Sequence, residues 1–360
     1  MGELLCKKGH RVTVLTPGYS GLIPHETLNG IEIRRLPVPG RGRAAFLSFV
    51  AGCILHIWRH RQKIDILQAH QLAGPALAAS LAGKLFAKPV VARVEGGSQS
   101  GSEIKLLAER LFGLLRIEFI KRNTDCFIAV SRPIEEDLAG YGINNVFLIQ
   151  NGVDTDRFHA CGKDDKAGLR RRLGLPLENV VFTFAGRLEY VKGVDILLQA
   201  WDKLSPAAGK VLSLVILGDG PLRKDVEAAA GKGNIIFRGA VENVDQYLMA
   251  SDVFVLPSRY EGSCVALLEA MSCGLAVLVS KAGGNPEIVG HGGGILFEPE
   301  NRCELAKWIE RLGDDEYLRS TLGREARAIA TGSFRLDDAV AKHEQVYNSA
   351  VSRRFPAIRS

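Results

Sequence analysis

Two cations in the second half of the sequence stand where a strand is expected to end. Arg187 directly follows Gly186 and the apolar run 180–185, and Lys192 comes just before a helical pattern. This placement suits a diphosphate, because an arginine chelates oxygens and a lysine acts as a point charge. A solvated basic loop explains the motif equally well when it is taken alone.

Two glutamates, Glu261 and Glu269, lie eight residues apart in the same half. Glu261 belongs to a loop, whereas Glu269 falls inside an apolar helical run, where an unpaired carboxylate would cost several kcal/mol. The vicinal hydroxyls of a ribose would satisfy Glu269, and a structural ion pair is the alternative. A glycosidase pair of general acid and nucleophile is disfavoured, because one glutamate is on a loop and the other on a helix.

Other turns rich in glycine offer weaker signals. Gly262 and Ser263 precede a helix and would present N–H groups to an anion or to sugar hydroxyls. Helix capping is a strong explanation for Gly283-Gly284 and the nearby Glu287, because an acidic residue is favoured in the first turn of a helix. The segment LVILGDGPL matches neither a Walker A loop nor the GxGxxG fingerprint, so a nicotinamide enzyme is disfavoured. No cluster suggests a metal site.

Apolar runs alternate with helical patterns along the whole chain, which indicates βαβ units and parallel sheets. We expect two α/β domains, 1–155 and 156–336, followed by a helical segment 337–360 that packs on either domain. The stretch 155–168 is expected to be a turn-rich linker, and 103–121 a single helix. The expected strands are 11–16, 64–68, 90–94, 126–130, 146–149, 180–185, 212–217, 235–237, 253–256, 276–280 and 294–297.

The charge of the chain is unevenly distributed. Of its 360 residues, 46 are Lys or Arg and 40 are Asp or Glu, a net charge of +6. Residues 1–154 carry 19 basic and 13 acidic residues, and the remainder carries 27 of each. The excess positive charge therefore belongs to the first domain. Seven dispersed cysteines without a CxxC pair favour a reducing cytosol.

Six stretches, in this order and spacing, resemble the retaining glycosyltransferases of family 4, which share the GT-B fold: SRPIEEDL, QNGVDTDRF, GRLEYVKGVDILLQAW, LVILGDGPL, ASDVFVLPSRYEGS and LLEAMSCGLAVLVSKAGGNPEIV. The resemblance implies two Rossmann-like doubly wound parallel-sheet domains facing a cleft. It also implies a nucleotide-sugar donor on the second domain, an acceptor on the first, and no metal or cofactor.

The resemblance further implies roles for individual residues. Arg187 and Lys192 would hold the diphosphate and offset the charge that develops as it leaves. Glu269 would bind the ribose. Retention needs no protein nucleophile in the family's usual account, in which the departing phosphate helps to deprotonate the acceptor. The implied catalytic residues are Glu261, Arg187 and Lys192, and the implied nucleotide-sugar contacts are Gly186, Arg187, Lys192, Glu261, Gly262, Ser263, Cys264 and Glu269.

The sequence departs from the family pattern at three places. Glu-Gly-Phe-Gly is usual where this chain has Glu261 to Cys264. A His-Gly pair that contacts the donor sugar is replaced by Glu95-Gly96, and His70 is better explained as a strand-end residue than as a substitute. Family members also begin with a strand and Gly-rich loop, about 20–30 residues, before the helix that Glu3 to Lys8 would finish.

A basic and apolar segment in the first domain suggests a surface function. Arg34, Arg35, Arg41 and Arg43 precede the charge-free stretch 44–58, and Arg59, His60, Arg61 and Lys63 follow it. The stretch is too short to span a bilayer. A buried helix with a basic end and a face on an anionic membrane are equally good interpretations. Nucleic acid is disfavoured, because aromatic residues do not interleave with the basic ones.

We expect an enzyme that transfers a sugar, with retention, to a carbohydrate or lipid-linked acceptor in the biosynthesis of a polysaccharide, lipopolysaccharide or glycolipid. We expect it in the cytoplasm, either free or peripheral on the cytoplasmic face of the membrane. One alternative is a weak or inactive GT-B relative that binds a nucleotide-sugar or a partner protein. A nucleotide-sugar epimerase of the same fold is the weakest alternative.

Overall fold

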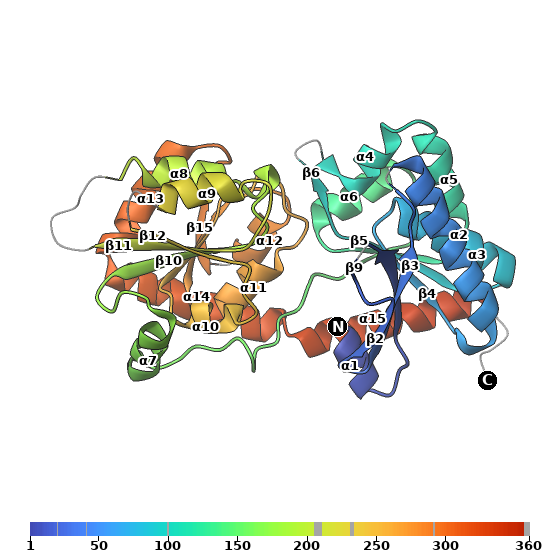
Figure 1. The fold of residues 1–360 in the computed structure, drawn as a ribbon, viewed down its shortest axis with the longest axis horizontal. Helices are drawn as coiled ribbons and strands as arrows, with labels where there is room; N and C mark the ends of the chain where they lie inside the picture. Colours follow the sequence, from blue (N-terminus) through green and yellow to red (C-terminus); the bar gives the residue numbers. More distant parts are fainter. Residues whose placement is uncertain are drawn as a thin grey trace. The chain divides into compact units, whose positions relative to one another are not determined.

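The computed structural model describes residues 1–19, 21–40, 42–98, 101–204, 211–230, 234–290 and 292–355. The chain divides into two compact units. Unit 1 contains Met1–Gln150 and the chain from Asp337, and unit 2 contains Asn151–Leu336. Each unit is built around parallel β-sheet covered by helices, as the sequence predicts (Figure 1).

Unit 2 contains one six-stranded parallel sheet in the order β12-β11-β10-β13-β14-β15. Its central strands are buried on both faces, which explains their continuous runs of β-branched and aromatic residues. The strands are β10 (Val180–Ala185), β11 (Leu212–Leu217), β12 (Ile235–Gly239), β13 (Val253–Leu256), β14 (Ala276–Ser280) and β15 (Gly294–Phe297).

Helices cover both faces of this sheet (Figure 1). One layer contains α8 (Val194–Trp201), α9 (Arg223–Ala230) and α13 (Arg302–Asp314). The other contains α7 (Lys163–Leu173), α10 (Val244–Met249), α11 (Val265–Ser272) and α14 (Glu316–Ser333). Two short helices, η2 (Tyr190–Lys192) and α12 (Asn285–Val289), lie in the loops that follow strands.

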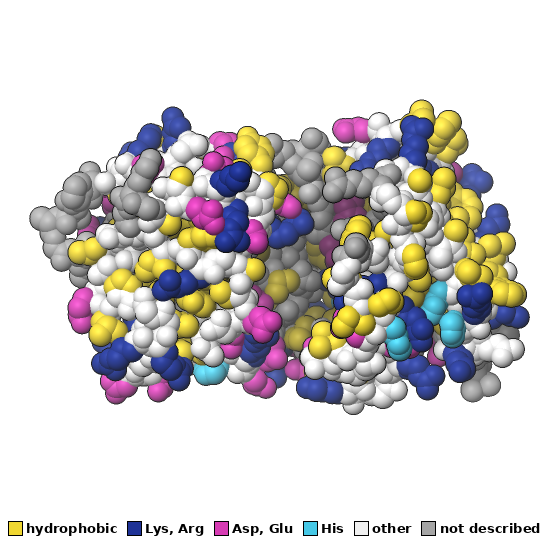
Figure 2. All heavy atoms as spheres, viewed as in Figure 1, with side chains coloured by type: hydrophobic (Ala, Val, Ile, Leu, Met, Phe, Trp, Pro, Cys, Tyr) yellow, Lys and Arg dark blue, Asp and Glu magenta, His cyan; other side chains and the backbone are white. Residues whose placement is uncertain are grey.

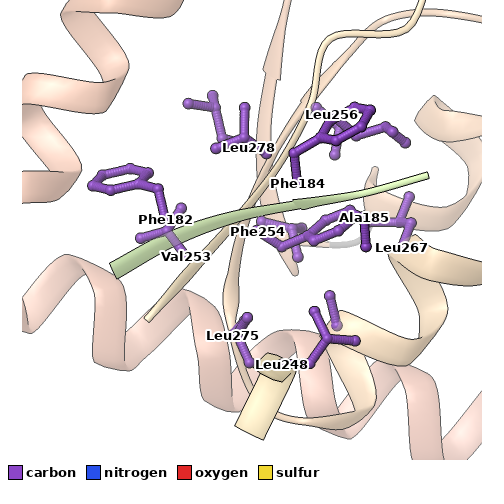
Figure 3. Close-up of a cluster of buried hydrophobic side chains, with 14 of the residues drawn as sticks. Phe182, Phe184, Ala185, Leu248, Val253, Phe254, Leu256, Leu267, Leu275 and Leu278 are labelled. Carbon is purple, nitrogen blue, oxygen red and sulfur yellow. The ribbon is translucent and has the colours of Figure 1, made fainter. Parts of the chain in front are cut away.

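The core of unit 2 lies between the sheet and these helices. Phe182 and Phe184 on β10 and Phe254 on β13 are fully buried, and Figure 3 shows them among Leu248, Leu267, Leu275 and Leu278. Burying one such side chain contributes about 1.5–3 kcal/mol. This packing makes the sheet a rigid platform for the loops at its edge.

Unit 1 contains two main sheets. A four-stranded parallel sheet has the order β4-β5-β8-β9, and a three-stranded sheet has the order β1-β3-β2. The first comprises β4 (Leu67–His70), β5 (Val90–Val94), β8 (Cys126–Ala129) and β9 (Val146–Leu148). The second comprises β1 (Thr13–Gly18), β2 (His25–Leu28) and β3 (Ile31–Pro37), and β6 (Gly97–Ser98) pairs with β7 (Gly101–Ser102).

Helices also cover the larger sheet of unit 1. Apolar residues of α3 (Gly74–Phe86), α5 (Gly113–Arg122) and α6 (Arg132–Gly140) pack on one face, and α15 (Leu336–Arg354) packs against Val91 and Ile128 on the other. The other helices are α1 (Gly2–Lys7), α2 (Arg43–His60), η1 (Arg61–Lys63) and α4 (Glu103–Ala108).

Three details of the sequence prediction were wrong. The expected helix 103–121 is two helices, α4 and α5, because Phe112 adopts a left-handed conformation and Gly113 packs against the carbonyl of Leu107. The expected strands 11–16 and 64–68 are both displaced along the chain, to β1 and β4. The expected linker 155–168 contains the start of α7, whose Asp164 and Asp165 lie in its first turn, where acidic residues are favoured.

The charge-free stretch 44–58 forms most of α2. None of the helices in the described ranges is long and apolar enough to cross a bilayer. Arg34 and Arg35 on β3 pair with Glu32 and Glu26. Arg41 lies outside the described residues.

Candidate functional site

Four loops meet at one edge of the unit 2 sheet. They follow β10, β11, β13 and β14, which are neighbours in the sheet, so the carboxyl ends of all four strands lie at the same edge. The order of the strands reverses at β10, since β11 lies on one side of it and β13 on the other. Ligands of doubly wound sheets bind at such a point.

Glycines allow the backbones of these loops to touch. A Cβ at Gly193 would lie 1.9 Å from the carbonyl oxygen of Pro257, and one at Gly283 would lie 1.7 Å from that of Glu261. Both glycines have positive φ angles, which other residues adopt with difficulty. Gly284 also donates its N–H to the Glu261 carbonyl at 2.9 Å. The Gly-Gly turn therefore fixes the backbone of Glu261. The sequence interpretation of this turn as a helix cap did not predict that role.

Lys192 and Glu261 form a buried ion pair in this group of loops. The Lys192 ammonium lies 2.8 Å from Oε1 and 2.9 Å from Oε2 of Glu261, which is only 5% exposed. Ser258 donates its hydroxyl to the same Oε1 at 2.6 Å. Burial opposes the charge of Lys192, but the nearby Glu261 carboxylate outweighs it, and the pKa of Lys192 is raised. Lys192 is therefore a permanent cation at physiological pH.

Arg259 fixes the loop that carries Lys192. Its guanidinium binds both carboxylate oxygens of Asp195, at 2.7 and 2.8 Å, and stacks 3.6 Å from the ring centroid of Tyr190. Such bidentate pairs fix the relative orientation of the two side chains in addition to balancing their charges. Arg259 comes from the β13 loop and Asp195 from the first turn of α8, so the pair ties the two loops that present Glu261 and Lys192.

Arg187 lies in the same loop as Lys192 but is solvent-exposed. Its guanidinium pairs with Glu189 at 3.0 Å. Its charge acts on Lys192, whose pKa it lowers slightly against the larger effect of Glu261. The two cations predicted from the sequence are thus close enough to interact electrostatically. Lys192 is held in place by Glu261, and Arg187 lies at the surface.

Glu269 lies in α11 and is half-buried. Within the described part of the chain, its carboxylate makes no hydrogen bond or ion pair, so the structural ion pair considered from the sequence is not formed there. Burial raises its pKa to about 7, with Arg157 lowering it and Asp245 adding to the rise. Arg157 is engaged by Asp245 at 3.3 Å. Glu269 therefore retains its capacity to accept hydrogen bonds.

The segment from Gly262 to Cys264 leads into α11. The Ser263 carbonyl accepts a 2.7 Å hydrogen bond from the Asn151 side chain, and the Ser263 hydroxyl accepts a 3.4 Å bond from the Asn151 N–H. Burial raises the pKa of the Cys264 thiol to about 12, so this thiol is not a nucleophile. Both side chains face protein, so only the backbone of this segment could contact a ligand.

A second polar network occupies the carboxyl ends of β4 and β5 in unit 1. Glu95 Oε1 lies 3.0 Å from His70 Nδ1 and 2.7 Å from the Nε of buried Arg93. Arg93 also donates to His343 Nε2 at 2.8 Å. Burial opposes ionisation of Glu95, but His70 and Arg93 hold its pKa below the usual range. His70 is the last residue of β4, as predicted, and the structure pairs it with Glu95.

Gly96 is fixed by another carboxylate. Its N–H donates to Glu103 Oε1 at 2.9 Å, and Glu103 Oε2 accepts the N–H of Leu72 at 2.7 Å. Burial raises the pKa of Glu103, although the backbone donors oppose the rise. The loop that carries Glu95 and Gly96 is therefore held by Glu103 from α4.

Sequence reasoning missed four residues that build these sites: Ser258, Arg259, Asn151 and Glu103. Three of them stood in the motifs PSRYEGS and QNGVD, but their partners are distant in sequence. Within the described ranges, no group of three or more His, Cys, Asp or Glu side chains could hold a metal ion.

Comparisons with known proteins identify the class. The family model "Glycosyl transferases group 1" matches residues 165–329, and "Glycosyltransferase Family 4" matches residues 1–157. The structure resembles that of Anabaena HepE in complex with UDP-glucose, with a TM-score of 0.75, 22% identity, and coverage of 89% of this chain and 87% of that one.

Two relatives illustrate the range of activities among similar sequences. The D-inositol 3-phosphate glycosyltransferase of Xylanimonas cellulosilytica is 27% identical over 98% of this chain and 91% of its own. The N-acetyl-alpha-D-glucosaminyl L-malate synthase of Bacillus anthracis is 26% identical over 96% of this chain and 91% of its own. The two family models identify the chain as a glycosyltransferase, and the structural likeness gives it the GT-B fold. Within this class, the chain belongs to the group 1 glycosyltransferases.

Proposed function

We propose that this glycosyltransferase moves a sugar, with retention of anomeric configuration, from a nucleotide-sugar to a carbohydrate or lipid-linked acceptor in glycan biosynthesis. The observation that carries the proposal is the Lys192–Glu261 pair at the carboxyl ends of β10 and β13. It places a permanent cation at the reversal point of a doubly wound sheet, where a diphosphate is expected.

The donor is proposed to bind through its diphosphate and ribose. An ammonium has three N–H donors, and Glu261 engages Lys192 through two oxygens, so a further N–H is available for phosphate. Exposed Arg187 is placed to exchange Glu189 for a second phosphate oxygen. The Glu269 carboxylate, which makes no hydrogen bond or ion pair within the described residues, would accept the ribose hydroxyls.

The proposed chemistry uses positive charge and no protein nucleophile. Lys192 and Arg187 would stabilise the negative charge on the leaving diphosphate. Glu261 is engaged by Lys192 and Ser258, which supports a role in holding the donor sugar over a role as a nucleophile. We propose that neither a metal ion nor a cofactor is needed, because these two side chains supply the charge.

The acceptor is proposed to bind unit 1. Separately from the acceptor, Glu95 and Gly96 at the end of β5 remain the candidates for a polar contact with the donor sugar. The basic balance of residues 1–154 suits an anionic glycan or an anionic membrane surface. We therefore also propose a cytoplasmic enzyme with a peripheral position on the cytoplasmic membrane face.

The test is a screen of UDP-, GDP- and ADP-sugars for hydrolysis by the wild-type chain, with NMR of the released anomer before it mutarotates. We expect hydrolysis of one donor class, release of the anomer present in the donor, and no loss of rate with a chelator. Release of the opposite anomer would contradict retention. Nucleotide-sugar binding without any turnover, with or without added acceptors, would instead support the weak or inactive relative.

A further inference from the structure

Helix α2 is apolar on two sides. Phe49, Val50, Cys53 and Ile57 are buried against the rest of unit 1. The opposite face is also apolar, because Leu47, Leu55 and Trp58 follow one another at helical spacing and are 64%, 44% and 48% exposed. A surface helix normally presents polar residues to water, so this second face calls for a partner.

A second exposed apolar group lies at the start of α5. Phe112, Leu114 and Leu115 are 65%, 63% and 69% exposed. Phe112 also has a φ of +59°, a conformation that is unfavourable for a bulky side chain. Phe112 thus combines a strained backbone with an exposed aromatic ring. Both features are unfavourable when the residue faces water.

The two groups lie on helices that contact each other. The Arg116 guanidinium of α5 lies 4.9 Å from the ring centroid of Phe46 in α2, so Leu115 and Leu47 are the sequence neighbours of a direct contact. Figure 2 shows hydrophobic side chains gathered over the part of unit 1 where Figure 1 places α5 and α2. We call this surface the docking face and define it by Leu47, Leu55, Trp58, Phe112, Leu114 and Leu115.

The charges around the docking face are positive. Residues 43–63 contain four Lys or Arg and no Asp or Glu. Arg43 begins α2, Arg59 lies in its last turn next to Trp58, and Arg61 stacks on the Trp58 ring at 5.7 Å. Exposed Arg110 precedes the α5 group, with one acidic neighbour, Glu109. Apolar residues with Trp, rimmed by Arg and Lys, are the composition of a helix that lies in the plane of an anionic bilayer surface.

We propose that the docking face binds anionic lipid bilayers, with Leu, Phe and Trp side chains entering the interface and the basic rim contacting the lipid headgroups. The role of this binding, which is to bring unit 1 to a membrane-borne acceptor, rests on the proposed function. The physical argument for binding depends only on α2 and α5. A second copy of the chain is the competing occupant, and it lacks support from charge because two basic rims would repel each other.

The experiment is co-sedimentation of the full chain with phosphatidylcholine vesicles, with and without phosphatidylglycerol. The apolar variant is Leu55→Ser with Trp58→Ser, and the charge variant is Arg59→Ser with Arg61→Ser. Tyr317→Ser is the control, because Tyr317 is an aromatic residue of unit 2 that is even more exposed than Trp58. Donor hydrolysis in solution and thermal unfolding are measured on every variant.

We expect wild-type and Tyr317→Ser to bind the anionic vesicles. The apolar variant should bind at least about tenfold more weakly, a change of about 1.4 kcal/mol. The charge variant should lose only the preference for anionic vesicles, and salt should weaken wild-type binding. Unfolding and donor hydrolysis should stay unchanged in both variants, since the substituted side chains are exposed and lie outside the donor site.

Two outcomes would overturn the proposal. Equal vesicle binding by wild-type and the apolar variant would show that the docking face does not bind the bilayer. A concentration-dependent dimer that Leu55→Ser with Trp58→Ser dissociates would assign the face to a second copy. Failure of the proposed function is distinguishable, since it would appear as absent donor hydrolysis while vesicle binding persists.

Discussion

The ammonium of Lys192 lies 2.8 and 2.9 Å from the two carboxylate oxygens of Glu261, although 69 residues separate them in the chain. Because Glu261 is buried, removing the cation leaves a carboxylate without its main partner. The pair therefore couples the stability of unit 2 to the proposed diphosphate site.

Lys192→Ala is expected to lower stability as well as donor binding. Breaking a fully buried pair costs about 3–5 kcal/mol, and the partial exposure of Lys192 reduces this to roughly 2–3 kcal/mol. Urea unfolding measures the loss. Lys192→Ala combined with Glu261→Gln should recover part of the stability without recovering donor binding. If the double variant regained both, Lys192 would have no role beyond neutralising Glu261.

Glu269 should make stability fall as pH rises through the acidic range. Its pKa is about 7 in the folded chain and near 4.5 otherwise, so between these values the folded state binds more protons than the unfolded state. The contribution of Glu269 to stability is then fully present below about pH 4.5 and declines as the pH rises to about 7. Buried His343, whose pKa is lowered to about 4, acts in the opposite direction.

The measurement is the urea midpoint of wild-type and Glu269→Gln across this pH range. The difference between the two proteins removes the effect of His343. It should grow in favour of Glu269→Gln as pH rises. A difference that does not change with pH would show that Glu269 titrates normally and is not desolvated.

The Gly-Gly turn should matter for Glu261 more than for the fold in general. Gly283→Ala would place a Cβ 1.7 Å from the Glu261 carbonyl oxygen, whereas Gly239→Ala shares a positive φ but has no atom within 4 Å. Both should lose about 1–2 kcal/mol from strain. Only Gly283→Ala should lose about a further 1–3 kcal/mol of unfolding free energy. It should also be the only one of the two variants that loses donor hydrolysis. Equal losses in unfolding and hydrolysis assays would contradict this positioning role.

Glu95 should contribute to unit 1 without affecting nucleotide binding. Glu95→Ala removes the carboxylate that pairs with buried Arg93, so a loss of about 2–4 kcal/mol is expected in thermal unfolding. The affinity for nucleoside diphosphates should not change, because their proposed contacts all lie in unit 2. Glu227→Ala removes the partner of exposed Arg223 and serves as the surface control, with no measurable loss. Weaker nucleotide binding by Glu95→Ala would show that Glu95 acts on the nucleotide site.

The strands of unit 2 could be predicted well from the sequence. Val180–Ala185, Leu212–Leu217 and Val253–Leu256 appear as predicted, because strands buried on both faces consist of unbroken apolar runs. The break between α4 and α5 could not, since it depends on the close packing of Gly113 against Leu107. Helical periodicity continues through that break.

The candidate site was only partly predictable. Arg187, Lys192, Glu261 and Glu269 stand in recognisable motifs, but the pairing of Lys192 with Glu261 follows from the adjacency of β10 and β13. The sequence does not encode that order locally. The contact of His70 with Glu95 follows similarly from the pairing of β4 with β5. Tertiary contacts thus decided which charged residues remain available to a ligand.

The central claim, that unit 2 binds a nucleoside diphosphate through Lys192 and Glu269, is tested most directly by calorimetric titration. Wild-type, Lys192→Ala and Glu269→Ala are titrated with UDP, GDP and ADP under conditions where all three proteins are folded. We expect one nucleotide to bind wild-type and to bind each variant at least about tenfold more weakly. Unchanged affinity in both variants would contradict the assignment of the site.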